Sequence, residues 1–158
     1  MQYLASTRFN NTTYAENINY RITNNEKLIY GTNIRIQEKY PFGSLFYVIE
    51  MNNEENRIEG IGLIKNSLIT DKKHNIYSIG DYNRYIYRGK YWISREKLMQ
   101  YNNDLVEIFD TILFKGKSHL KRLSGISVIT NKLFTNWPYE EKNLKENIKR
   151  IFIQEFIK

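Results

Sequence analysis

Residues 45–64 read LFYVIEMNNEENRIEGIGLI and are the most clearly patterned stretch of the sequence. The apolar runs at its two ends, 45–51 and 57–64, have the length and composition of buried strands. The polar residues NNEEN between them have the composition of a turn, so the stretch predicts a β-hairpin. Gly60 and Gly62 lie two positions apart, and hence on one face of the second strand, where they permit a bend or the close approach of another backbone.

Further strands and helices are predicted on both sides of this hairpin from hydrophobic periodicity and capping residues. The other strands are expected over residues 3–9, 28–30, 33–37 and 85–93. Helices are expected over residues 13–20, capped by Thr13 with Glu16 completing a capping box, over 95–100 and 105–113, capped by Ser94 and Asp104, and over 140–158. Strands outnumber helices, and the alternation of a doubly wound sheet is missing. We therefore expect one α+β domain over residues 1–158: a small twisted mixed β-barrel with peripheral helices and a C-terminal amphipathic helix.

The composition excludes several classes of protein. The chain has 158 residues, of which 41% are hydrophobic and 26% charged, as in a soluble globular domain. It has no cysteine, which excludes disulfide scaffolds, thiol catalysis and all-cysteine zinc sites. No apolar run approaches 18 residues and no signal peptide is visible, so we expect an intracellular, cytoplasmic protein without a membrane partner. The abundance of Asn, Ile, Lys and Tyr is typical of an AT-rich coding genome such as that of a large DNA virus, in which case the host cytoplasm or the virion is the expected location.

The net charge of +7 is concentrated in the middle of the chain. Residues 1–83 hold nine basic and nine acidic side chains, residues 84–122 hold nine and four, and residues 123–158 hold six and four. Such a basic excess favours a polyanionic partner, nucleic acid. In the same region Tyr85, Tyr87, Tyr91 and Trp92 are interleaved with Arg84, Arg88, Lys90 and Arg95. This mixture is typical of surfaces that stack bases and pair with phosphates, although a half-buried Tyr-rich sheet would have it too.

Candidate catalytic residues are few. His74 and His119 lack the spacing of metal ligands, so we expect no metal and no cofactor. His119 lies in a basic loop over residues 114–122, where it could be the general acid or base of a nuclease or simply a polar residue that faces phosphates.

Several short segments resemble, in the same order, a YTH/EVE-type domain of the PUA-like superfamily. RFNN at residues 8–11 is similar to the Lys-Ser-Asn-Asn-like segment that opens that family's binding loop, and YGT at 30–32 is similar to its Trp-Ser-Thr. IYS at 76–78, with Tyr82 five positions after its tyrosine, resembles Val-Trp-Ser followed by a second Trp at that distance. YWI at 91–93 resembles the Arg-Trp-Ile strand that comes next. Each proposed cage position holds Tyr where the family has Trp.

The resemblance, which spans about residues 3–125, implies a twisted barrel and a non-enzymatic RNA reader. RNA is favoured over DNA, and a modified base similar to N6-methyladenosine would lie in an aromatic cage. The base-binding residues it implies are Asn10 at the purine edge, Tyr30, Gly31, Thr32, Tyr77, Ser78 and Tyr82. The expected phosphate-binding residues are Arg84, Arg88, Lys117, Lys121 and Arg122. The alternatives are a small ribonuclease on an ASCH-like barrel that uses His119, and a basic virion or scaffold protein that binds nucleic acid without specificity.

Overall fold

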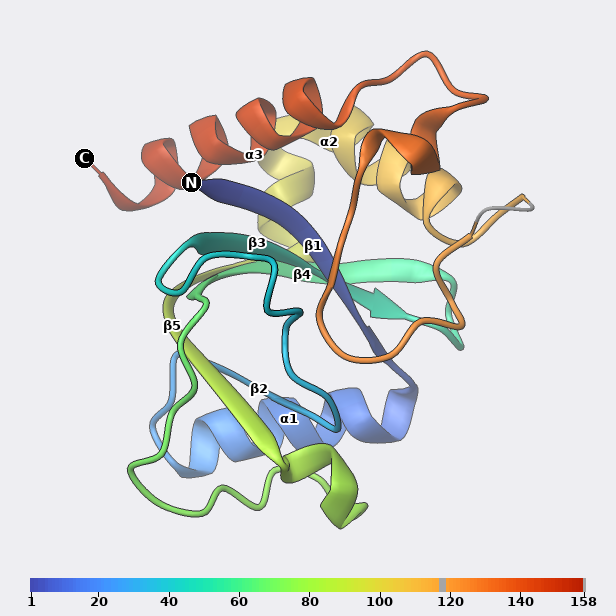
Figure 1. Cartoon of the computed structure of the whole chain (residues 1–158). Helices are drawn as coiled ribbons and strands as arrows, with labels where there is room; N and C mark the ends of the chain where they lie inside the picture. The colour runs from blue at the N-terminus through green and yellow to red at the C-terminus, as the bar shows by residue number, and fades with distance from the viewer. Residues whose placement is uncertain (117–118, 158) are drawn as a thin grey trace.

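The computed structural model describes residues 1–116 and 119–157 (Figure 1). The strands in this part of the chain are β1 (Gln2–Phe9), β2 (Leu28–Thr32), β3 (Leu45–Asn52), β4 (Arg57–Lys65), β5 (Tyr85–Ser94) and β6 (Ser127–Val128). The α-helices are α1 (Asn11–Thr23), α2 (Arg95–Ile112) and α3 (Glu141–Phe156), and 3-10 turns cover Gly80–Asn83 and Asn131–Phe134. None of the helices described is long and apolar enough to cross a membrane.

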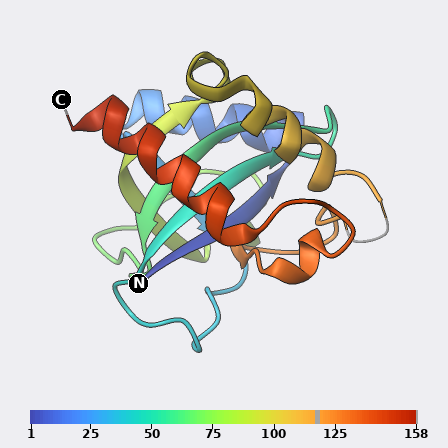
Figure 2. The same ribbon diagram turned by 90° about the horizontal axis from the view of Figure 1, so that it is seen from above.

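The strands form one mixed sheet in the order β2-β5-β4-β3-β1-β6. β1 runs parallel to β3, and the other neighbouring strands are antiparallel. The sheet curls into a half-barrel (Figure 2), so that β1 and β2 approach each other although three strands separate them in the sheet. The rings of Phe9 on β1 and Tyr30 on β2 have centroids 6.5 Å apart. The predicted α+β class and the mixed, curled sheet are confirmed.

The predicted hairpin is β3 and β4, and β3 lies in the middle of the sheet with both faces buried. Tyr47, Ile49 and Met51 pack on one face beneath α2 and α3. Phe46 and Val48 pack on the other face, where α1 lies (Figure 1). Burial on both faces explains why the apolar run of this strand is continuous rather than alternating.

The start of α1 differs from the prediction. Asn10, and not Thr13, is the N-cap: Asn10 Oδ1 accepts a hydrogen bond from the Thr13 N–H at 2.8 Å. Thr13 Oγ1 in turn accepts from the Asn10 N–H at 3.0 Å, so Thr13 takes the place in the capping box that was predicted for Glu16. The helix therefore begins immediately after β1 and extends to Thr23 rather than to about Tyr20.

The two helices predicted over 95–100 and 105–113 are the two halves of α2, which meet at non-helical backbone. Ser94 caps it as predicted, since Ser94 Oγ accepts from the Lys97 N–H at 3.2 Å. The kink lies at Asn102, which has φ −161° and ψ 88°. Asn102 Oδ1 accepts from the Leu105 N–H at 3.1 Å and thus serves the second half of the helix in the role predicted for Asp104.

The strand predicted over residues 33–37 is wrong. The Thr32 hydroxyl donates to the Ile34 carbonyl at 2.6 Å, which turns the chain away from β2. The Ile36 N–H then donates to the Tyr87 hydroxyl at 2.9 Å. Ile36 is buried while Ile34 is 49% exposed, so the alternation of apolar residues here reflects separate contacts of a loop.

Gly60 and Gly62 do leave room for a close approach, but for side chains from other strands. A Cβ on Gly62 would overlap the Tyr30 hydroxyl, and one on Gly60 would lie 2.7 Å from Trp92 Nε1. The buried Glu50 carboxylate accepts hydrogen bonds from both groups, at 2.7 Å from Tyr30 and 3.1 Å from Trp92. It also pairs with the buried Arg21 guanidinium at 2.9 Å and accepts from the Tyr14 hydroxyl at 3.4 Å. A polar cluster therefore ties α1 to β2, β3 and β5 of the sheet.

Candidate nucleic-acid interface

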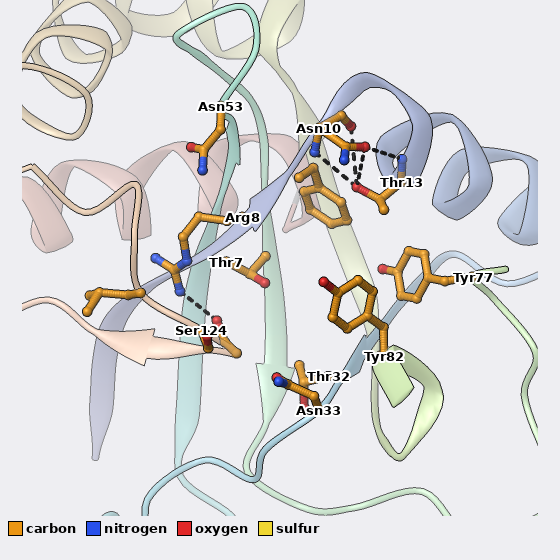
Figure 3. A pocket seen from close by; sticks show the side chains of 14 residues that line it. Thr7, Arg8, Asn10, Thr13, Thr32, Asn33, Asn53, Tyr77, Tyr82 and Ser124 are labelled. Carbon is orange, nitrogen blue, oxygen red and sulfur yellow. Dashed lines mark hydrogen bonds between the residues drawn. The ribbon is translucent and has the colours of Figure 1, made fainter. Parts of the chain in front are cut away.

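A cavity of about 290 Å³ opens where β1 and β2 approach each other (Figure 3). Five separate parts of the chain line it: the end of β1 with the start of α1, the end of β2, the β3–β4 turn, the region before β5, and the segment before β6. The lining residues are Thr7, Arg8, Phe9, Asn10, Thr13, Gly31, Thr32, Asn33, Asn53, Tyr77, Tyr82, Leu123, Ser124 and Gly125. Its volume is at the lower limit of about 300–1,000 Å³ for small-molecule sites.

Two tyrosine rings form an aromatic corner of this cavity, opposite Arg8 and Ser124 (Figure 3). The Tyr77 and Tyr82 rings have centroids 6.3 Å apart and planes 84° apart. Tyr77 is buried and its hydroxyl accepts from Asn17 Nδ2 at 2.9 Å, and desolvation raises the pKa of Tyr77 to about 12. Tyr82 is 39% exposed, so its ring remains open to solvent.

The loop that carries both rings is fixed by hydrogen bonds. Asn83 Oδ1 accepts from the Ile76 and Tyr77 N–H groups at 3.1 and 2.9 Å. Asn83 Nδ2 donates to the Tyr77 carbonyl at 2.8 Å. The Ser78 N–H donates to Glu16 Oε2 on α1 at 2.9 Å. The perpendicular arrangement of the rings is therefore held from inside the loop and from the helix beside it.

Asn10 supplies a hydrogen-bond donor at the rim. Its Oδ1 is committed to the α1 cap, where it accepts from Thr13 N–H at 2.8 Å and from Thr13 Oγ1 at 3.1 Å. Its Nδ2 has no hydrogen-bond partner among the described residues. The assignment of oxygen and nitrogen follows from the cap, because a backbone N–H requires an acceptor. Asn10 Nδ2 can thus donate a hydrogen bond to an acceptor atom of a ligand, whereas Oδ1 already accepts hydrogen bonds from Thr13.

Arg8 lies across the cavity from the tyrosines and is surrounded by neutral acceptors. Its Nη1 donates to Ser6 Oγ at 3.0 Å and to the Leu120 carbonyl at 3.3 Å. Its Nη2 donates to the Gly125 carbonyl at 2.6 Å and to Ser127 Oγ at 3.1 Å. Burial lowers the pKa of Arg8 to about 10. These bonds fasten the segment before β6 against β1 and so close one side of the cavity.

The structure brings together five of the seven residues predicted to bind a base. Those that line the cavity are Asn10, Gly31, Thr32, Tyr77 and Tyr82. Tyr30 is not among them: its ring is 1% exposed, it points into the core towards Glu50, and desolvation raises the pKa of its hydroxyl well above the ordinary value. Ser78 lies on the other side of its loop, in the depression beside α1.

The predicted phosphate-binding residues are not in one place. Arg88 forms a two-bond ion pair with Glu26, at 2.9 and 2.8 Å, and a further bond with Asp71 at 3.1 Å. Arg84 is exposed, lies over the Tyr85 ring at 5.5 Å from its centroid, and makes a 3.4 Å contact with Asp81, a surface pair of small energy. Lys121 and Arg122 directly precede the lining residue Leu123, and Arg122 is exposed. Lys117 lies outside the described residues.

The sequence interpretation missed part of the lining. Arg8 and Phe9 were within the RFNN segment, whose position beside Asn10 was an available signal. Nothing in the sequence marked Asn53 or Leu123. The latter reaches the cavity because Arg8 binds carbonyls of its segment, 112 and 117 positions further along the chain.

The two histidines lie apart from the cavity lining. His74 is buried, with the Tyr20 hydroxyl 2.6 Å from Nδ1 and the Asp71 carboxylate 2.8 Å from Nε2. His119 Nδ1 accepts from the Lys121 N–H at 3.3 Å. Within the residues described, no group of three or more His, Asp or Glu side chains is arranged to hold a metal ion.

Comparison of the chain with protein-family models, with curated proteins and with solved structures gave no match.

Proposed function

We propose that the chain is a PUA-like RNA-binding module that holds one modified base, of the N6-methyladenine type, in the cavity between β1 and β2. The observation that carries the proposal is the aromatic corner of Tyr77 and Tyr82 facing a polar wall within about 290 Å³. A single base is a ligand of suitable size and chemistry, since it has two apolar faces and a polar edge.

Tyr77 and Tyr82 supply the contacts for the apolar faces of the base and for its methyl group. A base that stacks on one ring meets the second ring edge-on, because the planes are 84° apart. Stacking on an aromatic side chain contributes about 1–3 kcal/mol per base. A methyl group in the corner between the rings would bury apolar surface on both, at about 25 cal/mol per Å². A corner formed by two rings therefore favours the methylated base over the plain one.

Polar groups elsewhere on the cavity wall supply the contacts for the polar edge of the base. Thr32, Asn33 and Ser124 carry hydroxyl and amide groups on the cavity wall, and Asn10 Nδ2 is a donor without a partner in the described structure. Lys121, Arg122 and Arg84 are the basic residues we assign to the flanking phosphates. Arg88 is not assigned this role, because Glu26 and Asp71 already neutralise it.

The test is the affinity of short single-stranded RNAs that differ only in one central adenosine, plain or N6-methylated. We expect the wild type to prefer the methylated RNA and Tyr82→Ala to lose most of that preference. The matched control is Tyr91→Ala, because Tyr91 is also exposed, at 43%, but packs on Phe156 away from the cavity. Equal binding of both RNAs by the wild type would contradict the reader function, and cleavage of either RNA would favour a nuclease.

A further inference from the structure

The cavity contains a partly buried positive charge that no carboxylate balances within the described structure. Arg8 lines it, and the hydrogen-bond partners of its guanidinium are hydroxyls, carbonyls and the Met51 thioether. The lining residues include no Asp or Glu. The pKa of Arg8 is lowered by desolvation alone, as expected for a cation with no acid close enough to stabilise it.

The hydrogen-bonding capacity of this guanidinium is nearly exhausted. Nη1 and Nη2 carry four hydrogens, and five oxygen atoms lie within hydrogen-bond distance of them. Only Nε, which is buried, lacks a partner. Arg8 thus has no pair of free N–H donors that could bind a phosphate through two hydrogen bonds. Its effect on a ligand comes from its positive charge.

The amino end of α1 does not provide a separate anion site at the rim. The Asn10 side chain caps the Thr13 N–H, and the Glu54 carboxylate accepts from the Asn11 N–H at 3.1 Å. A carboxylate of the protein therefore already occupies the position that an external anion would take at this helix end.

We propose that Arg8 makes the cavity selective for uncharged bases, so that it admits N6-methyladenine but rejects bases that methylation makes cationic, such as 1-methyladenine. The inference rests on the proposed function, because it concerns the base held between the two tyrosines. It assigns to Arg8 a role in specificity that is separate from fastening the segment before β6.

Stacking on tyrosine favours a cationic base over a neutral one, whereas repulsion by Arg8 favours the neutral base. The order of the two affinities therefore tests the inference. A cationic base stacks better than a neutral one on an exposed tyrosine, by about twofold to fivefold. Two like charges held within one cavity repel each other, and at an effective dielectric constant of about 20 this weakens binding by about tenfold or more. With Arg8 present the cationic base should therefore bind more weakly, and without that charge it should bind more tightly.

The experiment compares three RNAs that carry N6-methyladenosine, 1-methyladenosine or 1-methylinosine at the same position. The last two have nearly the same shape, but only 1-methyladenosine is cationic. We expect wild-type protein to bind the 1-methyladenosine RNA at least fivefold more weakly than the 1-methylinosine RNA. Equal or tighter binding of the cationic base by the wild type overturns the charge selectivity and needs no variant to interpret.

Two variants separate charge from structure. Arg8→Gln removes the charge and should reverse the order of the two RNAs, whereas Arg8→Lys keeps the charge and should keep the order. If Arg8→Gln fails to fold, the Lys variant and the wild-type comparison still decide the question. If the wild type shows no Tyr82-dependent preference for N6-methyladenosine over adenosine, the proposed function fails and this inference fails with it. If the preference for N6-methyladenosine over adenosine is retained but the 1-methyladenosine and 1-methylinosine RNAs bind equally well, only the charge selectivity is overturned.

Discussion

The Tyr30 hydroxyl donates a hydrogen bond to the buried Glu50 carboxylate at 2.7 Å, and it reaches that position through the space above Gly62. This hydrogen bond explains why Tyr30 does not line the cavity, although the next residue in the chain, Gly31, does. The Tyr30 ring instead lies behind Phe9, with the centroids 6.5 Å apart, and supports the cavity wall from the core. Glu50 is fully buried, so the hydrogen bonds it accepts are required to compensate its desolvation.

The first prediction concerns the space above Gly62. Gly62→Ala would bring a Cβ into overlap with the Tyr30 hydroxyl and close to the Leu28 side chain. Overpacking of this kind costs about 1–3 kcal/mol, measured as the free energy of unfolding in urea. Gly80→Ala is the control, because a Cβ there meets no atom within 4 Å, and it should change stability by less than about 0.5 kcal/mol. Equal effects of the two substitutions would contradict the described packing of Tyr30.

The second prediction separates the two roles of Asn10. Asn10→Ser retains an N-cap oxygen and should keep stability within a few tenths of a kcal/mol, whereas Asn10→Ala should cost about 1 kcal/mol. Both remove the Nδ2 donor, so both should weaken binding of the N6-methyladenosine RNA by about 1 kcal/mol. Thermal unfolding and RNA titration of the same samples measure the two quantities. An Asn10→Ser variant with unchanged affinity would show that Asn10 only caps the helix.

The third prediction concerns the dependence of RNA affinity on salt. Replacing Lys121 and Arg122 with Ala removes two cations beside the cavity. The slope of log K against log salt should become shallower by about 1.4, which is about 0.7 for each phosphate contact to single-stranded RNA. Lys142→Ala with Arg150→Ala, two exposed positions on α3, is the matched control and should leave the slope unchanged. The same change in both double variants would mean that the basic residues act only through net charge.

The fourth prediction concerns alkaline pH. The pKa of buried Tyr77 is raised to about 12, whereas an unfolded tyrosine titrates near pH 10. Between pH 10 and pH 12 the folded state therefore binds more protons than the unfolded state. The contribution of protonated Tyr77 to the free energy of unfolding is thus complete below about pH 10 and is lost as the pH rises towards 12. It amounts to about 2–3 kcal/mol. Tyr77→Phe should reduce the loss, measured by urea unfolding at pH 9 and pH 11; an unchanged pH dependence would argue against burial of this hydroxyl.

The elements that could be predicted from the sequence are those with a local pattern. The β3–β4 hairpin, the Ser94 cap and α3 each follow from residues that are close together in the chain. The strand predicted over 33–37 is wrong because alternation is also produced by a loop in which Ile36 is buried by a contact with Tyr87. No local pattern distinguishes these two cases.

The candidate site could be predicted in part, for a related reason. Tyr77 and Tyr82 share a short loop, and the resemblance of that loop to the YTH/EVE-type segment implied that they lie in one site. The direction of the Tyr30 side chain depends on Gly62 and Glu50, which come from other strands. The position of Leu123 depends on Arg8, more than 100 positions earlier in the chain. Such contacts become apparent only once the sheet order is known.

The assembly of the cavity from five parts of the chain has a consequence for how binding is detected. Residues 7–13, 31–33 and 123–125 lie together only when the sheet has closed, so the unfolded chain has no comparable affinity. By mass action, a ligand present at 100 times its Kd raises the free energy of unfolding by about 2.7 kcal/mol. Free nucleosides, screened one by one for an increase in Tm, are thus a direct route to the preferred base, and the size of each increase ranks their affinities.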